Sequence, residues 1–158
     1  MTNGVFKSLG SYGHARAMNV LSTQSSVDFE WSVKLIGGWR FCVGVASRLE
    51  RINSFIVEYD QNAILYRSWE NPLPDIQIGK LVIHGNVTKH QLGDIIRFRF
   101  QPHAKKLLID LVRILDFPWP NSQFKNGHWE IDLKDNVDYF PVVQCTDGGD
   151  TIKAHLVT

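Results

Sequence analysis

Residues 93–111 read GDIIRFRFQPHAKKLLIDL, with two apolar runs on either side of a short polar turn. In the first run apolar and basic side chains alternate, which is typical of a strand with one buried face. The turn contains a proline, which cannot donate to a ladder of backbone hydrogen bonds. This segment therefore predicts a β-hairpin with the strands Ile95–Phe100 and Leu107–Leu111.

Four segments before this hairpin also have the pattern of strands. Phe29–Leu35 alternates in the same way, and Trp31 lies on its apolar face, where we expect core packing. Phe41–Ala46 is apolar at nearly every position and contains a glycine, so we expect a central strand that is covered on both faces. Phe55–Glu58 and Ala63–Tyr66 flank a polar turn and are predicted to pair as a hairpin.

The second half of the chain continues the pattern. Leu111–Asp116 is compatible with a strand or a short helical turn, and Asn126-Gly127 indicates an irregular crossing. Trp129–Leu133 alternates again, with its tryptophan expected in the core. Phe140–Cys145 and Thr151–Val157 flank a glycine-rich turn, so the chain is predicted to end as a hairpin.

Length and composition suit a single globular domain. The chain has 158 residues, of which 44% are hydrophobic and 21% charged, so one core is expected. Short strands with turn signals about every 8 to 12 residues, and no convincing amphipathic helix, predict an all-β antiparallel sandwich or barrel.

Net charge, hydropathy and cysteine content indicate which classes of protein and partner to expect. Seventeen basic and sixteen acidic side chains give a net charge of +1, so no bulk charge attracts nucleic acid or an anionic membrane. Neither a signal segment nor a membrane span is recognisable, and we expect a soluble cytoplasmic protein. Cys42 and Cys145 lie in apolar runs, where free buried thiols are expected.

Four segments in order resemble the SPRY-type domain family. They are the aromatic strand Phe29–Lys34, the glycine-containing strand Cys42–Ala46, the hairpin that begins at Gly93-Asp94, and the proline-bearing strand Tyr139–Val143. The glycine and asparagine that usually end the return strand of this hairpin are absent, because Asp110-Leu111-Val112 stands there. The resemblance covers about residues 27–157.

The resemblance implies a fold and a function. The fold would be a two-sheet antiparallel β-sandwich, a concanavalin A-like jelly roll, over residues 1–158, with 1–26 as an N-terminal extension or first strands. The function would be non-catalytic binding of a protein or short peptide, without a cofactor or metal, through loops at one edge. Such a module can serve as the substrate-recognition part of a ubiquitin ligase or of a scaffold protein. We expect a monomer or part of a longer chain.

The candidate loops, carried over by position, are Ser47–Ser54, Arg67–Asp75 and Thr146–Gly149. Arginine supplies forked hydrogen-bond donors, and tyrosine and tryptophan are enriched at interface hot spots. The candidate partner-binding residues are Arg48, Arg51, Tyr66, Arg67, Trp69, Trp119, Thr146 and Asp147.

An alternative hypothesis is carbohydrate binding or hydrolysis. Glu130, Asp132 and Asp135 resemble the acidic strand signature of sandwich-fold endoglucanases, and the period of two places the first two on one face. The simpler interpretation is the polar outer face of an edge strand. Six dispersed histidines show no metal-ligand spacing, and no catalytic motif is recognisable, so an enzyme is not expected.

Overall fold

The computed structural model describes residues 4–7, 13–16, 20–35, 41–47, 60–68, 75–84, 93–115, 122–145 and 151–155. These residues form strands, turns and irregular segments without a helix. The strands are β1 (Gly4–Lys7), β2 (Gly13–Arg16), β3 (Leu21–Ser22), β4 (Phe29–Leu35), β5 (Phe41–Ala46), β6 (Ile64–Ser68), β7 (Asp75–Ile78), β8 (Leu81–His84), β9 (Ile95–Gln101), β10 (Lys106–Leu115), β11 (Ser122–Asp132), β12 (Asp138–Cys145) and β13 (Thr151–His155).

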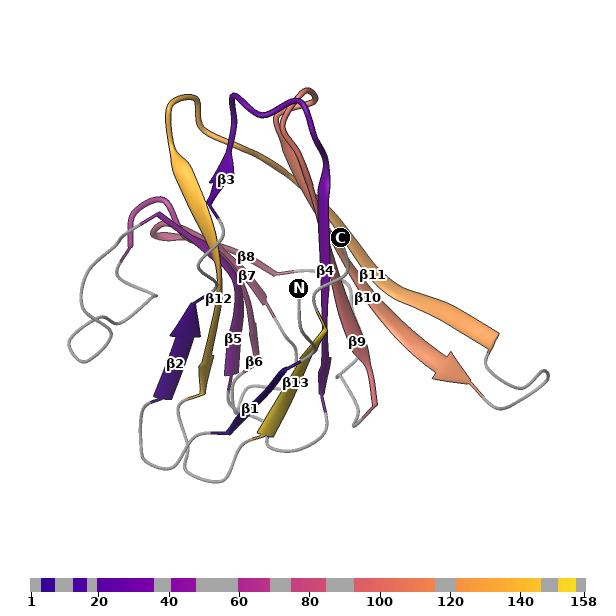
Figure 1. Ribbon diagram of the computed structural model, residues 1–158. Helices are drawn as coiled ribbons and strands as arrows, with labels where there is room; N and C mark the ends of the chain where they lie inside the picture. Colours follow the sequence, from indigo (N-terminus) through magenta and orange to yellow (C-terminus); the bar gives the residue numbers. More distant parts are fainter. Residues whose placement is uncertain are drawn as a thin grey trace.

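The strands form two antiparallel sheets that face each other (Figure 1). Sheet 1 has the order β1-β13-β4-β9-β10-β11, and sheet 2 has the order β2-β12-β5-β6-β7-β8, with β3 added beside β12. The alternating patterns predicted an all-β sandwich or barrel, and the two-sheet sandwich that the family resemblance implied is confirmed. In the described part of the chain, no helix is long and apolar enough to cross a lipid bilayer.

The main core lies between the two sheets, on the faces that the alternation predicts. Trp31 of β4 stacks on Phe98 of β9, with ring centroids 4.9 Å apart and both side chains buried. Trp129 is partly buried and packs against the same core. Its ring lies 5.9 Å from that of Tyr66 in sheet 2, so the aromatic contacts join the two sheets.

Strand β5 is buried at every position, which confirms the prediction that both of its faces are covered. Phe41, Val43 and Val45 belong to the main core. Cys42 and Ala46 lie on the opposite face in a second apolar cluster with residues from β6 and β12, and Cys42 is a free thiol. The continuous apolar run of β5 thus reflects two packing layers rather than one.

The hairpin that the sequence predicts at residues 93–111 is present and extends further. β9 and β10 pair from Gln101 and Lys106 to Ile95 and Val112, so the segment from Leu111 is a strand and not a helical turn. Asn126-Gly127 does not interrupt β11. Gly127 pairs with Leu111 while the next pair is Val112 with Lys125, so Asn126 is the extra residue of a β-bulge.

Two predicted hairpins are wrong. β6 pairs with β5 on one side and β7 on the other, so no edge of β6 is left for residues 55–58, which lie outside the described residues. The last two strands belong to different sheets, because β12 pairs with β2 and β5, whereas β13 pairs with β1 and β4. A two-residue hairpin between β7 and β8, with its turn at Gly79-Lys80, was not predicted.

A buried carboxylate holds together the two ends of the segment that follows β5. Asp60 is 1% exposed and accepts hydrogen bonds from the backbone N–H of Ser47 at 2.6 Å and of Asn62 at 2.9 Å. The hydroxyl of Ser47 donates a further bond to it at 2.9 Å. Residues 48–59 therefore begin and end at a fixed point of the sheet.

We expect Asp60→Ala to lower the free energy of unfolding by about 2 kcal/mol, because it leaves partly buried N–H groups without this acceptor. Urea denaturation measures this change. Asp138→Ala is the control, since this exposed carboxylate should contribute less than about 0.5 kcal/mol. Equal stability of both variants would show that the Asp60 hydrogen bonds are dispensable.

Candidate binding site

The register of the strands defines two ends of the sandwich. The Arg67 end carries Leu35 and Asp94 of sheet 1 and Phe41, Arg67 and Cys145 of sheet 2. The Phe100 end, at the opposite ends of the same strands, carries Phe29, Ala46, Phe100 and Asp138. The segments 69–74 and 146–150 both leave strands at the Arg67 end, whereas Ser47 follows β5 at the Phe100 end.

The three candidate loops were expected to lie together at one edge of the sandwich. The strand register shows instead that they do not all start from the same end. Two of them, after Ser68 and after Cys145, do so. The third starts about 20 Å away, because six residues of β5 separate the two ends. The path of that loop lies outside the described residues.

At the Arg67 end, β6 and β7 are joined by a two-pronged ion pair. Arg67 donates from Nε to Asp75 Oδ1 at 2.7 Å and from Nη2 to Asp75 Oδ2 at 2.9 Å. The side chains are only 14% and 11% exposed. Because bidentate guanidinium–carboxylate pairs have a fixed geometry, this one holds the strand ends from which the segment 69–74 leaves.

Sheet 1 has an equivalent pair at the same end. Arg113 of β10 donates from Nε and Nη2 to the two oxygens of Asp94, at 3.0 and 3.1 Å. The side chain of Asp94 is 2% exposed and that of Arg113 is 18% exposed. The hydrogen bond to Asp94 raises the pKa of Arg113, against an opposing effect of burial, so the guanidinium remains charged at neutral pH.

The phenol of Tyr66 lies near both pairs. Burial raises its pKa, and the negative charge of Asp94 raises it further. Its hydroxyl is buried without a hydrogen-bond partner, and its ring stacks on Phe41 at 6.1 Å. The prediction that Tyr66 belongs to a contact surface is therefore wrong: its period-two position turns it into the core.

The other candidate residues are distributed as follows. Arg67 is mostly buried and holds Asp75, so it supports the loop that follows it rather than projecting from it. The remaining six lie outside the described residues: Arg48, Arg51, Trp69, Trp119, Thr146 and Asp147. Sequence reasoning missed Asp94 and Arg113 as partners, because Asp94 belongs to the predicted hairpin but Arg113 lies two residues beyond its predicted end.

The three carboxylates of the carbohydrate hypothesis lie on the outside of sheet 1 and in the turn that follows it. Glu130, Asp132 and Asp135 are 58%, 84% and 59% exposed. Asp132 pairs with Lys106 and Asp135 with Lys105, so these two carboxylates face two different lysines. This matches the simpler interpretation of a polar outer face, because a pair of hydrolytic carboxylates must flank one bound sugar.

A histidine beside Glu130 is part of the same polar face. His128 Nδ1 contacts the buried carboxylate of Asp110, and its Nε2 lies 3.2 Å from Glu130 Oε1. Arg99 reaches Asp110 from β9 at 3.7 Å. A general base needs one ring nitrogen directed at its substrate, whereas here both nitrogens face carboxylates, so the arrangement is that of a bridge across neighbouring strands.

Comparisons with known proteins identify the fold. No protein-family model matches the chain, and no curated protein matches it by sequence. The SPRY domain of human HERC1 is similar in structure, with 15% identity, a TM-score of 0.62, and coverage of 94% of this chain and 85% of that one. A legume lectin-like domain from Entamoeba histolytica has 15% identity, a TM-score of 0.57, and coverage of 98% and 80%. Lectin II from Ulex europaeus has 13% identity, a TM-score of 0.53, and coverage of 94% and 81%.

The chain thus has the fold of the concanavalin-like β-sandwiches, a class that includes these lectins. Within that class its fold is SPRY-like, which confirms the resemblance of the four sequence segments.

Proposed function

We propose that this chain is a non-catalytic module that binds a protein or short peptide through loops of the sandwich. The observation that carries the proposal is the pair of bidentate ion pairs at the Arg67 end, one in each sheet. They fix the strand ends from which the segment 69–74 leaves and from which the β9–β10 hairpin begins. Loops on a rigid base bind with a smaller loss of conformational entropy than free loops do.

The chemistry of the attached segments fits this role. Trp69 follows β6 directly, and Thr146-Asp147 follows β12 directly, so both start from this base. Arg48 and Arg51 follow Ser47, whose position Asp60 fixes. Tryptophan and arginine provide most of the binding energy in many protein interfaces. The SPRY-like fold further supports a role as the substrate-recognition part of a ubiquitin ligase or of a scaffold protein.

A pull-down from cell lysate, read by mass spectrometry, tests the proposal. The variant Arg48→Glu, Arg51→Glu, Trp69→Ala should capture at least about tenfold less of a specific partner. A tenfold loss of affinity corresponds to about 1.4 kcal/mol, and substitution of a single hot-spot residue costs about 2 kcal/mol or more. The matched control is Lys80→Glu, Lys105→Glu, Leu81→Ala, which also reverses two charges and truncates one exposed apolar side chain. It should capture as much partner as the unsubstituted chain.

Capture that is equal for the loop variant and the control, with both variants folded, would show that the binding surface is wrongly placed.

The lectin-like neighbours favour carbohydrate binding as a second candidate function. Saturable binding on a glycan array that Glu130→Gln abolishes, without any loop-dependent protein partner, would favour that candidate.

A further inference from the structure

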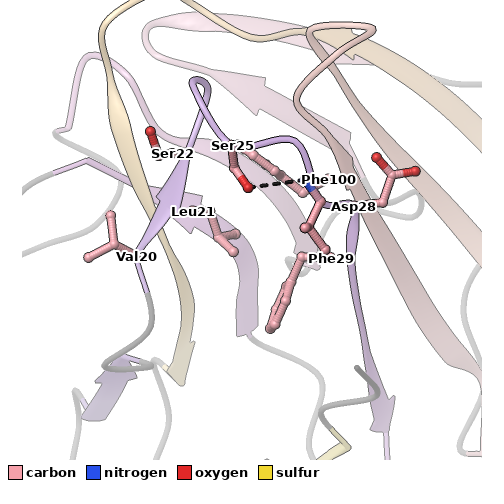
Figure 2. A pocket seen from close by; sticks show the side chains of 8 residues that line it. Val20, Leu21, Ser22, Ser25, Asp28, Phe29 and Phe100 are labelled. Carbon is pink, nitrogen blue, oxygen red and sulfur yellow. Dashed lines mark hydrogen bonds between the residues drawn. The ribbon is translucent and has the colours of Figure 1, made fainter.

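A second candidate site lies at the Phe100 end of the sandwich, opposite the end from which the segments 69–74 and 146–150 leave. A pocket of about 120 Å³ opens between β3 and the start of β4 (Figure 2). Leu21, Phe29 and Phe100 form its apolar floor, and Val20 and Val27 are at its rim. Leu21 and Phe100 are buried and belong to the main core, so the floor of the pocket is continuous with the rigid interior.

Two exposed valines lie among the residues that line the pocket. Val20 is 52% exposed and Val27 is 70% exposed, and both are among the few large hydrophobic side chains exposed in the described residues. Singly exposed hydrophobic residues need no explanation, but two beside one hollow form a patch that loses contact with water when a ligand enters.

The turn that carries the rim is held by its own hydrogen bonds. The N–H of Ser25 donates to the carbonyl of Ser22 at 3.1 Å. The hydroxyls of these two serines accept from the N–H groups of Gln24 and Val27, each at 3.1 Å. Figure 2 shows the Ser25 bond within the turn that precedes β4. The pocket is therefore formed before any ligand arrives.

Two carboxylates give this end of the sandwich a negative charge. Asp28 lines the pocket and is exposed. Asp138, also exposed, lies opposite Ser22 in the β3–β12 ladder. Within the described residues neither has an ion-pair partner, whereas the nearby Asp135 is paired with Lys105. A ligand that carries positive charge beside its apolar group would compensate both carboxylates.

We propose that this pocket binds the aliphatic side chain of a linear peptide in which a lysine or arginine neighbours that side chain. The pocket has room for one small aliphatic group on its apolar floor. The carboxylates fix the flanking cation, and the apolar floor takes the side chain. The residues that line this site include none of those named for the proposed function.

The test is an NMR titration of the ¹³C-methyl-labelled full chain with the acetylated, amidated probe peptide Gly-Lys-Leu-Lys-Gly. We expect saturable shifts of the methyl groups of Val20, Leu21 and Val27, with a millimolar dissociation constant. A peptide with alanine in place of leucine should bind about fivefold more weakly, and one with glutamates in place of the lysines should show no saturable shift.

Two variants of exposed residues test the site without disturbing the fold. Val27→Gln and Asp28→Lys should each weaken binding of the leucine peptide about fivefold, and 0.5 M salt should reduce the effect of Asp28→Lys. Leu81→Gln, which changes an exposed apolar side chain at the β7–β8 turn, four strands from β12 along sheet 2, should leave the affinity unchanged. The proposal is overturned if the shifts map elsewhere, if the pocket variants bind like the parent, or if no shift saturates.

Discussion

Replacing Gly44 by alanine is expected to destabilise the protein by about 3 kcal/mol or more, among the largest effects of a single added methyl group in this chain. A Cβ atom at Gly44 would lie 2.0 Å from the backbone oxygen of Ile64 and 3.0 Å from its carbonyl carbon. These atoms belong to the neighbouring strand β6, and they cannot turn away as a flexible side chain would. The added methyl group must push β5 and β6 apart at the centre of sheet 2.

Gly93→Ala is the matched control, because the chemical change is the same. Its Cβ would meet no atom within 4 Å, but the backbone has a φ of 93°. Only backbone strain of about 1 to 2 kcal/mol should therefore result. Urea denaturation of both variants, with unchanged m-values, checks the difference. If Gly44→Ala cost no more than Gly93→Ala, the close approach of β5 and β6 would not be a constraint on this sequence.

Arg113→Met is expected to lower the free energy of unfolding by about 3 to 5 kcal/mol, since it leaves the carboxylate of Asp94 buried without its guanidinium partner. The side chain of Asp94 is 2% exposed, so water can reach it only if the structure opens. Burial without a partner is costly for a charged group. Thermal and urea denaturation measure the loss.

The double variant Asp94→Leu, Arg113→Met separates this charge penalty from lost packing. It removes both charges, and replacing a buried ion pair by apolar side chains is often neutral, so most of the stability should return. Lys105→Met is the exposed comparison and should change stability by less than about 0.5 kcal/mol, because Lys105 and Asp135 are both more than half exposed. A double variant as unstable as Arg113→Met would contradict an electrostatic cause.

Sequence reasoning was most successful where a strand and its partner are close in the chain. The hairpin at residues 93–111 was predicted because its alternation and turn are local, and the observed register follows from that turn. In the observed β9–β10 ladder the last pair is Val112 with Ile95, so the next position brings Arg113 opposite Asp94. Continuing the hairpin by two residues would therefore have revealed the Asp94–Arg113 pair from the sequence.

The bulge at Asn126 shows a different limit. An Asn-Gly pair between strands is a strong turn signal, yet here the ladder continues on both sides of it. The long pairing of β10 with β11 compensates for the one residue left without a partner. Local turn preference was thus outweighed by tertiary contacts, which a single sequence does not display.

The alternation of apolar and polar residues was enough to determine the class of the fold and which side chains of most strands face inward, because the period of two in a strand is a property of the backbone. Only the tertiary structure decided the partner of each strand. β12 and β13 are neighbours in sequence but pair in different sheets, and Tyr66 is a core residue although its strand ends two positions later. The choice of partner depends on contacts between residues distant in the chain, whose free energy appears only when both sheets have packed.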